Sequence, residues 1–448
     1  KDLDLVIFGA TGFTGQFVVQ EVVRTLSQAE AALRRPLRWA IAGRSEERLR
    51  KVLVIIKQLD RRTGDRAGPA LVVADIESPD SLASMAQRAH VIATCVGPYR
   101  THGEALVKAC IAHGANYVDV TGEATFIGRS VETHGDEATR SGVAIVHACG
   151  YDSAPAEMGA VYATRLLEAR NATPASIEAF YTFSSRSSGA AINNGTYEAA
   201  IQEMGSVREI IQLEQAANKK YQVEYAGPSP KSWWPIRYEK RLGGWTVPYF
   251  LTDGLVVETS QRLMVAQRDK KAKVTLTPPP AIYYEPYLLL PVYALPAAVF
   301  FVGAIALFTL VAQFPLGRRL LKAHPRLFTA GMVSSSGPNI ESIESSSFQQ
   351  HMIARGYSRS QSTSAAADKA PASSAVTAAE PDVQLEVQVN GPNPAYTCTA
   401  ICLVQCAYVL LDRKQRKRVS NGVLTPAAAF WNTDLLDRLQ ANGLRYSV

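Results

Sequence analysis

The hydrophobic positions in the first 150 residues follow two alternating patterns. Short apolar runs rich in valine, isoleucine and alanine predict buried parallel strands at 3–8, 37–42, 70–75, 90–96, 117–120 and 144–149. Segments with helical spacing of apolar residues lie between them, at 17–26, at 46–57, from about residue 78, and at 103–113. This regular order of strand and helix predicts an α/β fold with a doubly wound parallel sheet.

The turn after the first strand carries three glycines at a spacing of three. In such a turn one glycine permits the sharp bend, one lets the backbone approach a pyrophosphate, and one lets the helix pack closely on the strand. The helix that follows offers free N–H groups to an anion. We therefore predict an N-terminal Rossmann dinucleotide-binding domain over 1–155. The predicted cofactor contacts in this turn are Gly9, Thr11, Gly12, Phe13, Thr14 and Gly15.

The end of the second strand indicates which cofactor is bound. Many NAD-binding folds place an acidic residue here to hold the ribose hydroxyls, but this strand ends at Arg44 and Ser45. An arginine fork beside a hydroxyl suits a ribose 2′-phosphate, which favours NADP(H) over NAD(H). The alternative is that Arg44 only begins the charged helix that follows.

Three further strand ends are expected to contribute to the cofactor site. Asp75, after the third strand, either accepts a hydrogen bond from the adenine amino group or caps the next helix. The fourth strand should lie beside the first, and ligands of doubly wound sheets bind outside the carboxyl ends of the strands. The predicted contacts at the fourth and fifth strand ends are Cys95, Val96, Gly97, Pro98, Thr121 and Gly122.

Several strings along the chain are similar to those of the saccharopine dehydrogenase-like oxidoreductase family. They are VIFGATGFTG, AGRS, CVGPYRTHG, YVDVTGE and GYDSAPAEMG, followed by RRLLKAHP, SFQQHMIARGYS and GVLTPAAAF. The resemblance covers nearly the whole chain and implies a Rossmann domain followed by a mixed α+β domain with a large sheet. It also implies an oxidoreductase whose substrate is not established, related to saccharopine reductase and more distantly to bacterial trans-acting enoyl reductases of glycolipid synthesis.

The remainder of the chain has a different pattern. Alternating positions predict strands at 176–183, 348–353 and 383–389, the last two paired with each other, and helical spacing predicts a helix at 196–213. The aromatic segments 233–235 and 245–250 either wall an apolar pocket or form sheet core. We divide this part into 156–286, a substrate or dimerisation domain; an apolar segment at 287–314; 315–358; a disordered Ser/Ala/Pro-rich loop at 359–382; and 383–448, which ends in a helix and a closing strand.

The apolar segment is long enough to enter a membrane. Residues 287–311 carry no formal charge over a length that exceeds the roughly 20 residues needed to cross a bilayer. Pro291 and Pro296 are expected to kink its first half, and tyrosines flank it. The segment predicts membrane association, either as one span or as a bent hairpin in a single leaflet. The family resemblance favours monotopic insertion, at a lipid-droplet, endoplasmic reticulum or mitochondrial surface.

Composition and charge exclude several other classes of protein. The 448 residues carry a formal net charge of +7, but the dense basic run at 413–418 has no interleaved aromatic residues, so we predict no nucleic-acid partner. That run is either a solvated loop or a contact to an anionic membrane. Six cysteines in a chain of this length do not make a disulfide framework, which indicates an intracellular, reducing compartment. Cys398, Cys402 and Cys406 are read as buried thiols, and no metal site is predicted.

The catalytic chemistry is less defined than the cofactor site. No tyrosine is followed by a lysine four residues later, so the dyad of short-chain dehydrogenases is absent from the sequence. Hydride transfer requires a positioned nicotinamide and at most one proton donor. Tyr99, Tyr151 and Asp152 are the candidate donors, because they lie at strand ends where the nicotinamide should be. The alternative for each is a hydrogen bond to turn backbone.

Three functions remain open from the sequence. The first is an NADP(H)-dependent reductase of a lipid-like substrate at a membrane, which the apolar segment and the enoyl-reductase relatives favour. The second is a saccharopine-type amino-acid dehydrogenase, which needs basic residues to receive carboxylates; Arg100, His102, Arg237 and Arg241 are available. The third is a catalytically silent nucleotide-binding scaffold on a lipid droplet or organelle. A homodimer is compatible with each of them.

Overall fold

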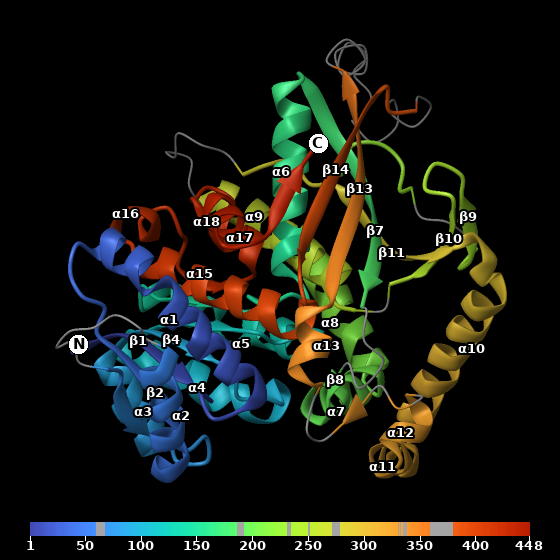
Figure 1. Cartoon of the computed structure of the whole chain (residues 1–448). Helices are drawn as coiled ribbons and strands as arrows, with labels where there is room; N and C mark the ends of the chain where they lie inside the picture. Colours follow the sequence, from blue (N-terminus) through green and yellow to red (C-terminus); the bar gives the residue numbers. More distant parts are fainter. Residues whose placement is uncertain are drawn as a thin grey trace.

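Two sheets organise the protein (Figure 1). The computed structural model describes residues 1–59, 68–185, 192–230, 234–249, 251–270, 278–329, 331, 333–334, 338–358 and 380–448. Within these residues the first sheet has the strand order β15-β6-β5-β4-β1-β2-β3 and the second has the order β16-β14-β13-β7-β11-β10-β9. A short third sheet pairs β8 (Ile192–Asn193) with β12 (Val333–Ser334).

The first sheet is parallel and confirms the predicted Rossmann architecture. Its strands are β1 (Leu3–Phe8), β2 (Trp39–Gly43), β3 (Ala70–Val73), β4 (Ala89–Thr94), β5 (Asn116–Asp119), β6 (Ala144–Val146) and β15 (Gly422–Leu424). As expected, β4 pairs with β1. The intervening helices are α1 (Phe13–Leu33), α2 (Glu46–Leu59), α3 (Pro79–Arg88), α4 (Tyr99–His113), α5 (Ala124–Arg140) and α6 (Ala154–Ala169).

The last strand of this sheet comes from the C-terminal part of the chain, which corrects one domain boundary. We expected 383–448 to belong wholly to the second domain, but β15 pairs in parallel with β6 through Val423 and Ile145. In addition, α15 (Thr399–Leu411) is buried almost entirely and packs on α1, β4 and β5. Its two cysteines, Cys402 and Cys406, are buried, as is Cys398 just before it, whose Sγ lies 3.8 Å from Cys402 Sγ. The C-terminal part therefore serves both sheets.

The second sheet is mixed and carries the longest strands. It contains β7 (Ala172–Ser184), β9 (Arg237–Glu239), β10 (Gly244–Pro248), β11 (Tyr283–Pro291), β13 (Ser347–Ser358), β14 (Val383–Pro392) and β16 (Arg445–Ser447). The predicted pairing of the two strands around 359–382 is confirmed, since β13 and β14 are antiparallel neighbours. Residues 359–379 of the predicted disordered loop lie outside the described residues. The only parallel pair among the described strands of this sheet is β7 with β11.

Helices pack around and below this sheet. The predicted single helix at 196–213 is two helices, α7 (Asn194–Met204) and α8 (Val207–Lys220), because the chain turns at Gly205 and Ser206. The other elements are α9 (Asp253–Lys270), α11 (Pro315–Ala323), α12 (Pro325–Phe328), α13 (Ile340–Glu344), η3 (Pro394–Cys398), α16 (Arg413–Arg416), α17 (Pro426–Phe430) and α18 (Leu435–Ala441). The predicted helix and closing strand at the C-terminus correspond to α17, α18 and β16.

The apolar segment does not form one continuous element. Its first residues complete β11 of the second sheet, a 3₁₀ turn η1 (Val292–Ala294) follows, and only α10 (Leu295–Ala312) is helical. Pro291 ends the strand and Pro296 lies in the first turn of α10, where proline is tolerated, so neither proline kinks a helix. In Figure 1, α10 forms the outer edge of the molecule on the side away from the first sheet.

Candidate functional site

The glycine turn after β1 has the geometry of a phosphate-binding loop. Gly9 has φ +86°, a conformation that side chains rarely adopt, and a Cβ on it would stand 2.9 Å from Val96 Cγ2. A Cβ on Gly15 would stand 2.1 Å from the Gly9 carbonyl oxygen, so only glycine lets α1 pack this close to the strand end. Gly12 is the N-cap of α1 and no side chain caps it. The first N–H groups of α1 are therefore available to an anion.

The other predicted residues of this turn are held from both sides. Thr11 lies beside Gly43 at the end of β2, where its side-chain oxygen would be 3.8 Å from a Cβ. The ring of Phe13, in the first turn of α1 with Thr14, packs edge-on against Tyr396 of η3, with ring centroids 4.8 Å apart. The C-terminal part of the chain thus closes one side of the turn.

Arg44 is placed where a cofactor phosphate could be read. It follows β2 directly, is exposed, and has no carboxylate in ion-pair distance among the described residues. Ser45 accepts a hydrogen bond from the Arg48 amide at 3.3 Å and so begins α2. Of the two interpretations of Asp75, the helix cap is wrong. Ser78 caps α3, and Asp75 accepts a hydrogen bond from the Glu77 amide within its own turn.

The turn after β4 is close to the glycine turn. The Cys95 amide donates to the Phe8 carbonyl at 2.9 Å, and the carbonyl carbon of Cys95 would be 3.2 Å from a Cβ on Gly9. Gly97 and Pro98 lead into α4. The N-terminus of α4 is already occupied, because the Glu123 carboxylate accepts the amides of Tyr99 and Arg100, each at 2.8 Å.

Tyr99 is the least suited of the three candidate proton donors. Its hydroxyl donates to the Thr94 carbonyl at 3.0 Å, and its ring stacks on Phe126 in the domain core. Burial raises the pKa of this phenol well above its ordinary value. The reading in which the hydroxyl binds turn backbone therefore describes Tyr99.

Asp152 lies in the turn between β6 and α6, and its carboxylate reaches the turn after β5. Its Oδ2 would be 2.8 Å from a Cβ on Gly122, so the glycine makes room for the carboxylate. Burial raises the pKa of Asp152 to about 6, which leaves a proton on it over much of the acidic range. Thr121, which precedes Gly122, is buried, and its side-chain hydroxyl accepts a hydrogen bond from the Glu123 amide at 3.1 Å.

Tyr151 connects Asp152 to a buried cluster that the sequence did not reveal. Its ring packs edge-on against Phe348 of β13, and its hydroxyl is buried without a hydrogen-bond partner among the described residues. Burial raises its pKa well above normal, and the charge of Asp253 adds to the effect. Tyr151 therefore faces the second sheet.

The centre of this cluster is Asp253, the first residue of α9. It is fully buried, and neither carboxylate oxygen has a hydrogen-bond partner within ordinary distance among the described residues. Around it are the hydroxyls of Tyr181 and Tyr284, 2.9 Å apart, and the ring of Tyr249, stacked on Tyr181 with centroids 4.0 Å apart. Burial raises the pKa of Asp253 well above its usual value, and the Tyr181 hydroxyl offsets only part of that rise.

The aromatic segments predicted from sequence contribute one residue to this cluster. Tyr249 is the member of 245–250 that reaches it, and its ring packs against the hydrophobic core, which fits the interpretation as sheet core. Trp245 instead donates its indole N–H to the Val292 carbonyl at 2.9 Å. Trp234 is exposed, while Trp233 lies outside the described residues. Asp253 was not predicted from the sequence, because a single aspartate before an apolar helix is also typical of a helix N-cap.

A second polar network lies at the ends of β5 and β6. His147 contacts Asp119 Oδ2 at 2.7 Å through Nδ1 and Ser130 Oγ at 2.8 Å through Nε2. The hydroxyl, imidazole and carboxylate resemble a hydrolytic triad in their order, but all three residues are buried. Asp119 also accepts the Tyr117 hydroxyl and the Ala148 amide. The network is satisfied internally and joins α5 to the sheet.

The basic residues considered for binding substrate carboxylates are engaged elsewhere. Arg100 pairs with Glu209 at 2.5 Å, and Arg241 pairs with Glu239 at 3.0 Å. Arg237 pairs with Glu178, which also receives Arg355 at 2.6 Å. His102 is half-buried on α4. Arg100 and His102 lie on α4, whereas Arg237 and Arg241 lie on β9 and in the turn after it, so the structure does not gather the four into one carboxylate-binding cluster.

The glycine turn, the open helix end and the strand ends around them define a dinucleotide-binding oxidoreductase fold. Residues 5–146 match the family model of the saccharopine dehydrogenase NADP binding domain. Over 448 residues the chain is 35% identical to a saccharopine dehydrogenase-like oxidoreductase of Pongo abelii, with 100% of this chain and 97% of the relative covered. The chain therefore belongs to the saccharopine dehydrogenase-like oxidoreductase family, and its first domain is an NADP(H)-binding domain.

Two further relatives extend the comparison. A Caenorhabditis elegans protein named lipid droplet localized protein is 30% identical, with 99% of this chain and 98% of the relative covered. Among solved structures, the apo form of saccharopine dehydrogenase (L-Glu forming) from Saccharomyces cerevisiae aligns over 99% of both chains with a TM-score of 0.51 at 10% identity. At that identity the likeness shows the shared fold only.

Proposed function

We propose that this protein is an NADP(H)-dependent oxidoreductase that transfers hydride to or from a lipid-like substrate at a membrane or lipid-droplet surface. The observation that carries the proposal is α10, an uncharged helix that presents most of its apolar surface to solvent on a domain attached to an NADP(H)-binding fold. The relative named for lipid droplets supports the choice of surface.

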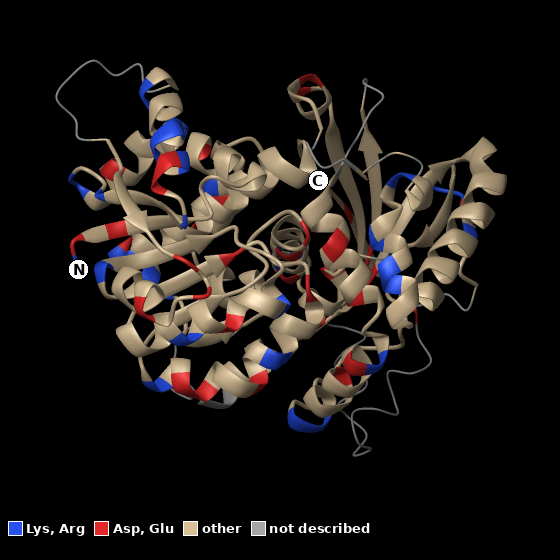
Figure 2. Ribbon diagram, turned by 90° about the horizontal axis from the view of Figure 1, so that it is seen from below, with Lys and Arg blue, Asp and Glu red and all other residues tan. Residues whose placement is uncertain are grey.

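The exposure of α10 is unusual for a helix of this composition. Only Ala298 and Ala312 are buried, whereas Phe300 is 77% exposed and Leu307 is 60% exposed. Figure 2 shows α10 as a helix without charged residues at the edge of the molecule. A contiguous apolar surface of this kind marks a site of association with another apolar phase or partner.

Both ends of α10 are fixed to the same domain, which favours insertion into one leaflet over a single span. At its start, β11 pairs with β7 and β10. At its end, Gln313 Nε2 donates to the Met204 carbonyl at 2.6 Å, and the Tyr197 hydroxyl donates to the Leu321 carbonyl at 3.1 Å. A helix crossing the bilayer would have to separate from one of these anchors. A helix lying in the membrane plane keeps both.

Asp152 is the proposed proton donor for the reduction. Its carboxyl lies at the end of β5, and a group with a pKa of about 6 can both hold and release a proton near neutral pH. Asp253 and the tyrosines around it lie on the second-domain side, where a substrate carbonyl or enoyl group would approach. NADP(H), when bound, supplies the hydride; these side chains orient the substrate and hold the proton.

The catalytic part is tested by NADPH oxidation with lipid and enoyl-thioester extracts. We compare the wild type with Asp152→Asn and, as a matched control, with Asp136→Asn, an exposed aspartate of α5. Wild-type turnover that falls at least about tenfold in Asp152→Asn and persists in the control supports the proposal. Saturable NADPH binding without turnover on any extract would instead identify the protein as a nucleotide-binding scaffold.

The membrane part is tested by flotation with phosphatidylcholine vesicles and artificial lipid droplets. Phe300→Asp combined with Leu307→Asp should abolish flotation while NADPH binding is retained. The control, Val54→Asp combined with Ile55→Asp, changes two exposed apolar residues of α2 and should float like the wild type. Equal flotation of the α10 variant and the wild type would overturn membrane association through this helix.

A further inference from the structure

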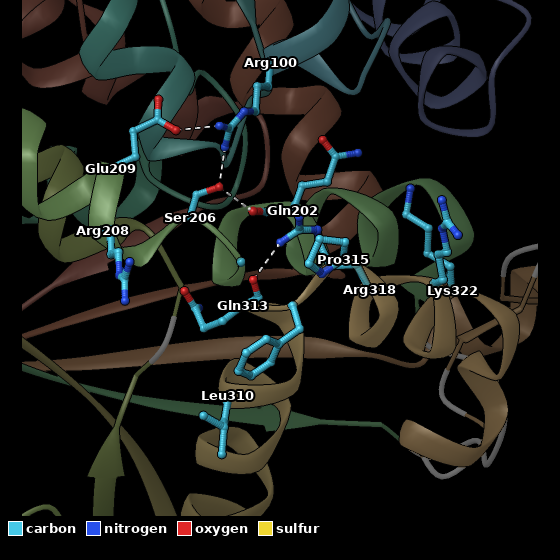
Figure 3. Close-up of a pocket in the computed structure, with 13 residues that line it drawn as sticks. Arg100, Gln202, Ser206, Arg208, Glu209, Leu310, Gln313, Pro315, Arg318 and Lys322 are labelled. Atoms are coloured by element: carbon cyan, nitrogen blue, oxygen red, sulfur yellow. Dashed lines mark hydrogen bonds and ion pairs between the residues drawn. The ribbon is translucent and has the colours of Figure 1, made fainter.

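A cavity of about 930 Å³ lies at the inner end of α10 (Figure 3). Its walls come from the turn between α7 and α8, the last turn of α10, the first turns of α11, and the side chain of Arg100 from α4. It therefore sits where the apolar helix, the second domain and the Rossmann domain meet. None of its residues belongs to the predicted cofactor contacts.

The cavity is strongly cationic. Its lining includes one carboxylate, Glu209, which already receives Arg100 at 2.5 Å and also pairs with Arg129 outside the cavity. The remaining basic residues of the lining are Arg208, Arg318, Arg319 and Lys322. Lys322 lies 3.9 Å from Glu198, and across the described parts of the chain no carboxylate is in ion-pair distance of the three arginines. Their charge is left for a ligand.

The cavity is also built rigidly. Gly205 lets the end of α7 approach α10, since a Cβ there would be 2.7 Å from the Ala312 carbonyl oxygen. Gly317 lets α11 fold back, since a Cβ there would be 1.9 Å from the Val311 carbonyl oxygen. Arg318 donates to the Ala312 carbonyl at 2.8 Å and so holds the end of α10. The backbone segments that carry the basic residues are therefore fixed relative to the apolar helix.

One wall of the cavity is apolar and continuous with α10. Leu310 and Phe314 line it and remain 58% and 59% exposed. Next to them, Leu316 and Leu320 of α11 are also exposed, on a helix that carries Arg319 and Lys322. Figure 3 shows Leu310 on the α10 side of the cavity and Lys322 on the α11 side. A ligand with an anionic head and an apolar tail would match both surfaces.

We propose that this cavity binds the phosphate head group of an anionic lipid whose acyl chains lie along the exposed face of α10. Arginine forks bind phosphate oxygens in pairs, and basic residues next to an inserted apolar helix attract anionic lipids. The proposal rests on the membrane association proposed above. It adds a preference for lipid charge that α10, which has no charged residue, does not provide.

The test compares vesicles of phosphatidylcholine alone with vesicles that also contain phosphatidic acid. The variant Arg208→Glu/Arg319→Glu removes two unpaired charges of the cavity but leaves the α10 anchor Arg318 in place. The control, Arg34→Glu/Arg170→Glu, makes the same change in net charge at two exposed arginines outside the cavity and outside the basic run at 413–418. The wild type and the control should bind the phosphatidic acid vesicles more tightly than the neutral ones. The cavity variant should lose at least about tenfold of that gain and retain binding to neutral vesicles and to NADPH.

Each other outcome is informative. An equal loss in the cavity variant and the control would show that diffuse charge, not the cavity, attracts the membrane, and would overturn the proposal. Inorganic phosphate at millimolar concentration is the further test. If it displaces the protein from phosphatidic acid vesicles and also raises the melting temperature of the lipid-free protein, the cavity is a site for free phosphate instead. If the α10 variant loses binding to both vesicle types while Arg208→Glu/Arg319→Glu keeps the preference for phosphatidic acid, this proposal fails. The proposed membrane association through α10 then still stands, so the two failures are distinguishable.

Discussion

The carboxylate of Asp152 lies 2.8 Å from the point where a side chain on Gly122 would begin. Gly122 belongs to the end of β5 in the Rossmann domain, and Asp152 precedes α6, which leads into the second sheet. The carboxylate of Asp152, the proposed proton donor, can therefore occupy this position only because Gly122 has no Cβ.

Gly122→Ala should lower the free energy of unfolding by about 1–3 kcal/mol, because the new methyl group and the carboxylate compete for the same space. In an Asp152→Ala background the same change should cost clearly less, since the competing oxygen is gone. Chemical denaturation of the four proteins in this double-mutant cycle measures the difference. Equal costs in the two backgrounds would contradict the contact.

Arg44→Ala should weaken NADPH binding about 10- to 100-fold and leave NADH binding nearly unchanged, because the guanidinium is proposed to contact the 2′-phosphate that only NADPH carries. Titration of both nucleotides by fluorescence or calorimetry measures the ratio. Arg48→Ala, an exposed arginine one turn along α2, is the control and should affect neither. If Arg44→Ala weakens both nucleotides alike, Arg44 does not read the phosphate.

Gly15→Ala should destabilise the first domain by about 3 kcal/mol or more and abolish NADPH binding, since its Cβ would overlap the Gly9 carbonyl oxygen. The contact is with backbone, which cannot rotate away. Gly135→Ala in α5 is the opposite case: nothing lies within 4 Å of its Cβ position, so it should gain about 0.5–1 kcal/mol. Thermal denaturation of both variants tests the pair, and a neutral Gly15→Ala would be inconsistent with the structure.

Glu157 should make stability fall as the pH rises. Burial raises its pKa to about 8, partly offset by the hydrogen bonds from Ser260 and the Ala427 amide, so the folded protein holds a proton that the unfolded chain releases near pH 4.5. Between these two values the folded state binds more protons, and its stability therefore decreases with pH.

The measurement is the free energy of unfolding at pH 5 and at pH 8 for the wild type and Glu157→Gln. The wild type should lose on the order of 2–4 kcal/mol more than the variant over this interval. Glu137→Gln, on the exposed face of α5, should follow the wild type. Parallel pH profiles of the wild type and Glu157→Gln would show that Glu157 is ionised in the folded protein.

Local patterns in the sequence were sufficient for the first domain and for its cofactor. Each strand of the Rossmann sheet up to β6 carries its own apolar run, and the three glycines are needed by a turn formed within fifteen residues. The uncharged stretch that contains α10 is likewise visible without any tertiary contact. Arg44 could be assigned to the cofactor site because it directly follows β2, a strand that its own apolar run predicts.

Contacts between residues far apart in the chain decided the rest. β15 pairs with β6, which lies nearly 300 residues earlier in the chain. A strand of three residues is too short for its pattern of apolar positions to predict it. Residues 287–291 joined β11 because β7 and β10 offered hydrogen bonds that a helix would leave unmade. The tyrosines around Asp253 come from three separate segments, and the cationic cavity comes from five helices. The sequence determined the elements and the cofactor turn, because those depend on neighbours along the chain. The tertiary structure alone decided which polar groups are buried together, because burial depends on elements that only folding brings into contact.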